Sequence, residues 1–187
     1  MISRSRRLRR AGVRRIVRHL MVSLNEQLLP EEIDVLARAG TSALDVSAMF
    51  VVQDVFRAAA ALRTRLESGA LAAEGLTWSS FTMLFCLWVW GPHETRELAE
   101  RMGVSRPTVS GVTDTLERRG LVERRAHAGD GRLRTVALTA SGERTFEELF
   151  PRFNAEESLA CAGLGAAERA HLAALLRTLV TTTREGT

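Results

Sequence analysis

The chain has 187 residues, with 26 basic and 22 acidic side chains and a formal net charge of +4. Hydrophobic residues make up 45% and charged residues 26%, as in ordinary globular proteins, which excludes a disordered or collagen-like chain. The two cysteines are too few for a four-thiolate zinc site or a disulfide framework. The longest apolar run, Met83 to Trp90, is well short of the roughly 20 residues of a transmembrane helix, so we expect no membrane partner.

Basic charge is concentrated in two places, and all of it is carried by arginine. Residues 1–20 contain eight arginines and no acid, and taking this +8 from the total of +4 leaves −4 for residues 21–187. Within that acidic remainder, residues 101–134 carry eight arginines against four acids. We expect any polyanionic partner at these two places.

The arginine-rich segment 1–20 has three interpretations. A block of like charges is typical of a disordered tail. It could instead contact DNA phosphates, or it could lie upstream of a true start of translation at Met21. Its composition resembles a transit peptide, but it lacks the apolar region of a secretory signal. We expect a basic, disordered arm over residues 1–27.

Two helices are predicted within residues 28–75. The first begins at Pro30, since proline followed by acids favours a first helical turn, and it ends at Gly40. The second is predicted as one long helix from Ala43 to Leu71. A long apolar stripe of this kind usually packs on another helix, including one from a second chain. The stripe consists of Met49, Val52, Val55, Phe56, Ala59, Leu62 and Leu66.

The region 76–140 opens with a helix that Thr77 caps and Gly91-Pro92 ends. This helix is apolar on nearly every side and is therefore expected to be buried. Two short helices follow. Thr95 is predicted to cap the first and Ser105 the second, with Gly103 in the tight turn between them. This spacing is typical of a helix-turn-helix.

The second short helix is expected to run to about Arg119. An apolar inner stripe is formed by Val109, Val112 and Leu116. Short polar side chains on the opposite face would allow it to sit deep in a DNA major groove, although a plain solvated face has the same pattern. That face carries Pro107, Ser110, Gly111, Asp114 and Arg118, with Arg106 and Thr113 toward its flanks.

A β-hairpin is predicted directly after this helix, from residues 121–125 and 132–138 joined by a turn. Arginines lie at its flanks and tip, which makes it a basic wing. A helix that reads the major groove and a wing arginine that enters the minor groove divide DNA recognition between them. We therefore predict a mainly α-helical fold with a small β-hairpin wing: a winged helix-turn-helix flanked by long helices.

The stretch LAERMGVSRPTVSGVTDTLERRGLVERR, followed by DGRLRTVALTASG, resembles the core of MarR-family transcriptional regulators, and the resemblance extends over residues 44–184. Its most specific part is an Asp-x-Arg wing tip followed by Leu-Thr-x-x-Gly. The resemblance implies that Asp130 orients basic side chains of the wing, that Arg132 enters the minor groove and that Thr139 caps the next helix. These motifs comprise Asp130, Arg132, Leu138, Thr139 and Gly142.

One position departs from the family pattern. The family commonly places an arginine after the serine of the recognition helix, whereas this chain has Gly111 after Ser110. Either the backbone approaches DNA closely there, or direct base reading is weaker and Arg106 takes over part of it. The expected DNA-binding residues are Thr95, Ser105, Arg106, Pro107, Thr108, Ser110, Gly111, Asp114, Arg118, Asp130, Arg132 and Arg134.

The segment 141–187 is predicted to hold two C-terminal helices, the first from Ser141 to Cys161 and the second from Ala166 to Thr183. In the family, these helices and the long N-terminal helix form a two-fold dimer, which suits a palindromic site. An intramolecular bundle is the alternative. The last helix is expected to turn a leucine stripe inward, consisting of Leu172, Leu175, Leu176 and Leu179.

Family members often bind small aromatic ligands, and a candidate pocket is lined by Trp78, Phe81, Phe85 and Trp88, although aromatic residues at helical spacing usually pack in a core. Urate is not expected, because Thr82 occupies the position of an acidic residue in the urate-responsive branch. Cys86 and Cys161 are expected to be structural thiols. The four histidines show no metal-ligand spacing, and no cofactor is expected.

These observations predict a cytoplasmic homodimer that binds double-stranded DNA at a pseudo-palindromic operator, as a repressor released by a small aromatic ligand. No phosphate loop, nucleophile elbow or paired-histidine motif indicates an enzyme. The alternative is a winged-helix module that has lost operator binding and recognises a protein.

Overall fold

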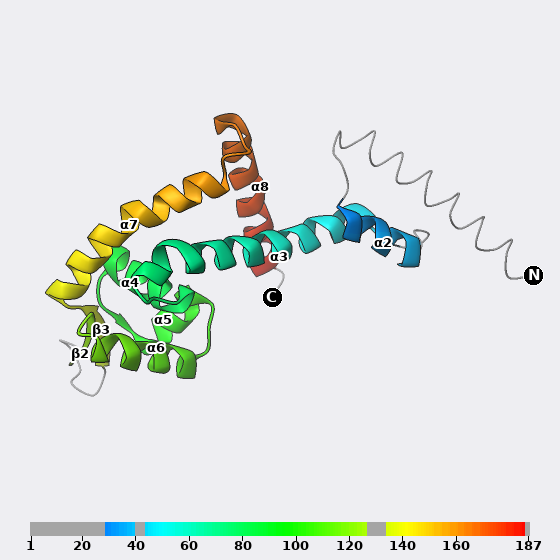
Figure 1. The fold of residues 1–187 in the computed structure, drawn as a ribbon. Coiled ribbons are helices and arrows are strands. Elements are labelled where there is room, and N and C mark those ends of the chain that lie inside the picture. Colours follow the sequence, from blue (N-terminus) through cyan, green and yellow to red (C-terminus); the bar gives the residue numbers. More distant parts are fainter. Residues whose placement is uncertain (1–28, 40–43, 127–133, 186–187) are drawn as a thin grey trace, which may run out of the picture. The chain divides into compact units, whose positions relative to one another are not determined.

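The computed structural model describes residues 29–39, 44–126 and 134–185 (Figure 1). The chain divides into two compact units, residues 1–60 and 61–187. The first unit contains α2 (Pro30–Ala39) and most of α3 (Val46–Leu66). At the N-terminal end of each of the two helices, a carboxylate accepts a hydrogen bond from a backbone amide. Glu32 Oε2 accepts from the Leu29 amide at 2.6 Å, and Asp45 Oδ1 accepts from the Ala48 amide at 3.0 Å.

The prediction of one continuous helix from Ala43 to Leu71 was wrong at its C-terminal end. α3 ends at Leu66 and a π-helical turn, η1 (Glu67–Leu71), follows with non-helical dihedral angles at Gly69. Glycine tolerates this backbone geometry. The Glu67 carboxylate accepts a hydrogen bond from the Trp78 amide at 2.9 Å, which ties this turn to the next helix.

The second unit carries the winged-helix elements α4 (Trp78–Trp90), α5 (Thr95–Met102), α6 (Arg106–Arg118), β2 (Val122–Ala126) and β3 (Arg134–Leu138), followed by α7 (Ala140–Ala160) and α8 (Ala166–Glu185). The hairpin β2–β3 confirms the predicted wing. A third strand, β1 (His93–Glu94), pairs antiparallel with β3, so the sheet order is β1-β3-β2. Its two residues are too few to show strand periodicity in the sequence.

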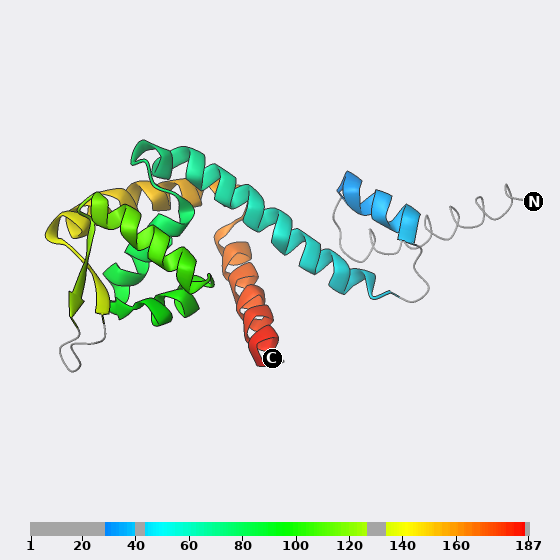
Figure 2. The same ribbon diagram turned by 90° about the horizontal axis from the view of Figure 1, so that it is seen from below.

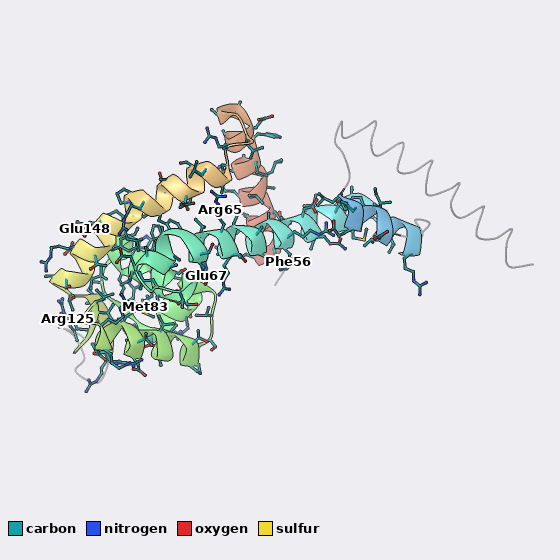
Figure 3. The ribbon with its side chains drawn as sticks, viewed as in Figure 1. Phe56, Arg65, Glu67, Met83, Arg125 and Glu148 are labelled. Carbon is teal, nitrogen blue, oxygen red and sulfur yellow. The ribbon has the colours of Figure 1, made fainter. Side chains whose placement is uncertain are left out.

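The core of this unit is formed around α4, as its apolar composition predicts. Figure 3 shows Met83 among the helices of the winged-helix part, and its side chain is fully buried. Its neighbours in the core come from α5, α6, the sheet and α7, and the largest buried side chains include Phe146 and Phe153. Three residues at the C-terminal end of α4 are exposed, namely Trp88, Val89 and Trp90.

The Leu-Thr-x-x-Gly motif joins the wing to α7. Thr139 caps the helix as predicted: its Oγ1 accepts from the Gly142 amide at 3.0 Å and donates to the Gly120 carbonyl at 2.6 Å. A Cβ atom on Gly142 would lie 1.9 Å from the Leu121 carbonyl oxygen. Glycine is therefore required here by close backbone packing and not by its φ angle.

α8 differs from the prediction in its burial. No described residue of this helix is buried within the chain, so its leucine stripe is not turned inward. Large apolar side chains are exposed along it, namely Leu172, Leu175, Leu176 and Val180. No helix in the described part of the chain is long and apolar enough to span a bilayer.

Candidate nucleic-acid interface

The helix-turn-helix is built by local capping. The prediction that Thr95 caps α5 was wrong by one residue: Glu94 is the cap and forms a capping box with Glu97, while Thr95 is the first helical residue. The Glu94 amide donates to Glu97 Oε2 at 3.1 Å. A glutamate three residues after the cap can reach back to this amide, and this reciprocal arrangement decided the start of the helix.

The turn between the two helices confirms the prediction. Gly103 has a left-handed backbone with φ of 65°, which ends α5. Ser105 caps α6, because its Oγ accepts from the Thr108 amide at 3.3 Å. Pro107 lies in the first turn, where its missing amide proton costs no helical hydrogen bond.

α6 has one buried and one exposed face. Val109 and Leu116 are fully buried, as predicted. Thr113, predicted near the flank of the outer face, is also buried, and its hydroxyl donates to the Val109 carbonyl at 2.8 Å. The bond satisfies the hydroxyl inside the helix, so a polar side chain can face the core. The exposed face consists of Arg106, Pro107, Thr108, Ser110, Gly111, Asp114, Thr115 and Arg118.

An ion-pair cluster joins α6 to the wing. The Arg124 guanidinium on β2 donates to Asp114 Oδ1 at 2.5 Å and to the Glu117 carboxylate. The hydrogen bond with Asp114 is the main cause that raises the pKa of Arg124 above its ordinary value. The sequence predicts Asp114 in the DNA-facing set but does not predict this partner, because local spacing does not reveal which strand residue lies opposite a helix.

Another arginine anchors the C-terminal end of α6. Arg119 donates to the Glu74 carbonyl at 2.8 Å and to the Gly75 carbonyl at 2.9 Å. These carbonyls precede α4, so a single side chain ties the C-terminal end of α6 to the segment before α4. No signal in the sequence separated this structural arginine from those available to a ligand.

The wing strands extend beside α6, as Figure 2 shows from below. Their register pairs Arg125 with Thr135 and Ala126 with Arg134. Arg134 is exposed, and so is Arg125, which is labelled at the edge of the wing in Figure 3 and pairs with Glu123 at 2.5 Å. The predicted tip residues Asp130 and Arg132 lie outside the described residues.

The four candidate pocket residues pack against aromatic side chains of α7. Phe81 stacks on Phe153 with 3.9 Å between ring centroids, and Trp88 lies 5.4 Å from Phe146. The ring centroid of Phe85 lies 6.0 Å from that of Phe150, and the ring centroid of Trp78 lies 6.3 Å from that of Phe153. These contacts are those of a packed core. A ligand site among these side chains stays a prediction.

The thiols and histidines have separate environments. Both cysteines are free; Cys86 is buried and Cys161 is half-buried. Burial raises the pKa of the Cys86 thiol, which makes it a poor nucleophile. Among the described residues, no group of three or more histidine, cysteine, aspartate or glutamate side chains is arranged to hold a metal ion.

The chain is similar to known transcriptional regulators. The model of the MarR family matches residues 76–133. The Bacillus subtilis (strain 168) HTH-type transcriptional regulator YwaE is 36% identical over 156 residues, which are 82% of this chain and 91% of YwaE. The HTH-type transcriptional repressor YetL of the same organism is 35% identical over 82 residues, covering 43% of this chain and 49% of YetL.

A solved structure shows the same fold. Bordetella bronchiseptica BpsR, a protein whose DNA binding is regulated by 6-hydroxynicotinic acid, superposes with a TM-score of 0.64 at 25% sequence identity. The superposition covers 70% of this chain and 92% of that one. The similarity therefore includes the flanking helices as well as the winged helix.

Proposed function

Since the chain belongs to the MarR family of winged-helix transcriptional regulators, we propose that it acts as a homodimeric repressor at a pseudo-palindromic operator in the cytoplasm. The observation that carries this proposal is the two-sided character of α6. On its apolar face Val109 and Leu116 are fully buried by their own chain and Val112 is half-buried, whereas its polar face is exposed beside a wing that carries arginine. An exposed helix of this kind fits the width of a DNA major groove.

The exposed residues of α6 divide by chemistry. Arg106 has the planar donor pair that matches a guanine edge, while Thr108 and Ser110 supply short hydroxyls for either base. Arg134, and Arg132 at the wing tip, supply charge for the minor groove and its phosphates. Asp114 acts through Arg124, holding the helix and the wing together, because its carboxylate is paired at 2.5 Å.

Dimerisation is supported by apolar surface that the chain leaves exposed. α8 exposes four large apolar side chains, and Phe56 on α3 is 73% exposed (labelled in Figure 3). Large exposed apolar surface in a small protein marks an interaction site. A second copy of the chain supplies the same apolar surface, and a two-fold dimer presents two α6 helices to one palindromic site.

Ligand control is supported by the relatives. BpsR responds to 6-hydroxynicotinic acid and YetL is a repressor. For this chain we propose repression relieved by a small aromatic ligand near Trp78, Phe81, Phe85 and Trp88. Two of these side chains, Trp78 and Phe85, are half-buried and Trp88 is more exposed, so a planar ligand has apolar contacts to join.

A footprint on the intergenic DNA upstream of the protein's own gene tests the proposal, because it reports occupancy, spacing and symmetry together. We expect a protected pseudo-palindrome whose affinity falls steeply with salt. Arg132→Ala should weaken binding to all sequences, whereas Arg106→Ala should change preference at particular base pairs. A purified dimer that binds no duplex better than competitor DNA, at any salt concentration, would contradict operator binding and favour a protein partner.

A further inference from the structure

Gly111 is an unexpected residue for its place in the fold. It lies in the middle of α6, where glycine is among the poorest helix formers because it loses the most backbone freedom on folding. Its φ is not left-handed, unlike those of Gly75, Gly91, Gly103 and Gly120. The helix therefore bears the cost of a glycine that its backbone geometry does not require.

Packing within the chain does not require the glycine either. Apart from its chain neighbours and the backbone of its own helix, a Cβ atom on Gly111 would meet no heavy atom within 4 Å. At Gly142, in contrast, the same atom would lie 1.9 Å from a carbonyl oxygen. The described part of the molecule thus explains one helical glycine by steric exclusion and leaves the other without an intramolecular reason.

The polar side chains that follow Gly111 on the helix are bound within the chain. Thr115, one turn later, donates its hydroxyl to the Gly111 carbonyl at 2.9 Å and is thereby held against the helix. The Arg118 side chain bends back to the Thr115 hydroxyl at 3.3 Å, and the Asp114 carboxylate is drawn to Arg124 at 2.5 Å. The Arg118 and Asp114 side chains are thereby held by partners in their own chain.

We infer that Gly111 is the point at which α6 lies closest to the base edges, and that the missing side chain sets the depth of the helix in the major groove. This inference rests on the proposed function. Close contact of helix backbone with bases needs a bound duplex of matching groove shape, so the glycine acts on specific binding and not on phosphate contacts. Gly111 is therefore a specificity-determining residue that stabilises the complex at the expense of the free protein.

The test compares Gly111→Ala with Gly163→Ala. Gly163 lies in the turn after α7, is exposed, has no left-handed φ and also has open space at its Cβ, so it is a matched control. Alanine at Gly111 should raise the melting temperature by about 2–4 °C, since it removes a mid-helix glycine. The same change should weaken binding to the wild-type footprint duplex by about tenfold or more, as expected when one good base contact is lost.

Three readouts separate the outcomes. Affinity for a non-specific duplex of equal length should stay within twofold, and Gly163→Ala should bind the footprint duplex like the wild type. Gly111→Leu should bind the footprint duplex more weakly than Gly111→Ala while remaining folded. Unchanged footprint affinity of Gly111→Ala, or a lowered melting temperature, would overturn the inference. A wild-type protein that binds no duplex would instead refute the proposed function itself.

Discussion

The helices α4 and α8 of the second unit differ in the burial of their apolar side chains. α4 buries Phe81, Met83, Leu84 and Leu87 within its own chain. α8 is longer, yet none of its described residues is buried, and Leu175 is 54% exposed. The comparison shows that an apolar pattern predicts that a helix will be covered, but not which molecule covers it. The winged helix is complete within one chain, whereas α8 has an apolar face that suits a second copy.

The largest expected effect on stability is at Gly142, where the wing packs against the start of α7 within one chain. In Gly142→Ala the new Cβ atom would lie 1.9 Å from the Leu121 carbonyl oxygen. Both groups belong to the backbone, so neither can move aside as a flexible side chain could. We expect the free energy of unfolding to fall by about 4 kcal/mol or more, in the range reserved for severe core defects. Urea denaturation followed by circular dichroism measures it. A loss below about 1 kcal/mol, as for a surface site, would show that the wing and α7 are not rigidly packed.

A substitution at Met83 tests the packing of the same unit by removing side-chain atoms, whereas Gly142→Ala adds one. Its side chain is fully buried and lies beside the Thr113 hydroxyl at 3.6 Å. Met83→Ala should lower the free energy of unfolding by about 3 kcal/mol, through lost apolar contact and an unfilled cavity. Met83→Leu is the control and should cost less than about 1.5 kcal/mol, because it nearly conserves volume. Equal losses for the two variants would contradict cavity formation as the cause.

A substitution on the exposed apolar face of α8 should change dimer formation and leave the folding of the chain intact. Leu175→Glu places a charge on the exposed apolar face of α8, and we expect the dimer dissociation constant to rise about a hundredfold, which equals about 2.7 kcal/mol. Analytical ultracentrifugation measures it, with far-UV circular dichroism as a check on helix content. Thr181→Glu adds the same charge on the opposite side of the helix and should leave the dimer intact. A Leu175→Glu protein that stays dimeric would place the interface elsewhere.

The smallest effect concerns the two thiols. Burial raises the pKa of Cys86 above its ordinary value, so its thiolate fraction at pH 8 is reduced, and buried sulfur is also shielded from reagents. Iodoacetamide at pH 8 should modify Cys161 about tenfold faster or more, given that the thiolate is the reactive species. The rate at Cys86 should rise as the pH is raised through the elevated pKa. Mass spectrometry of digested protein reports both sites, and comparable rates would contradict the burial of Cys86.

Features that depend only on neighbouring residues could be predicted from the amino-acid sequence. The positions of Ser105, Gly103 and Thr139 at helix ends were predicted correctly, because caps and left-handed glycines act over three or four residues. The burial of most of α4 followed from its apolar composition on nearly every side, and the order of helices and wing strands followed from local sequence patterns. The prediction of Thr95 as the cap of α5 was wrong by one residue, since a glutamate capping box can replace a hydroxyl cap.

Tertiary structure alone decided which distant groups meet. The strand β1, the ion pairs of Arg124 and the carbonyl contacts of Arg119 all join segments whose separation along the chain carries no signal of their distance in space. It also distinguished two glycines that look alike in the sequence: Gly142 is required by a carbonyl of its own chain, while Gly111 faces open space. Whether a glycine is needed depends on the atoms that surround its absent side chain, and only the folded chain places them.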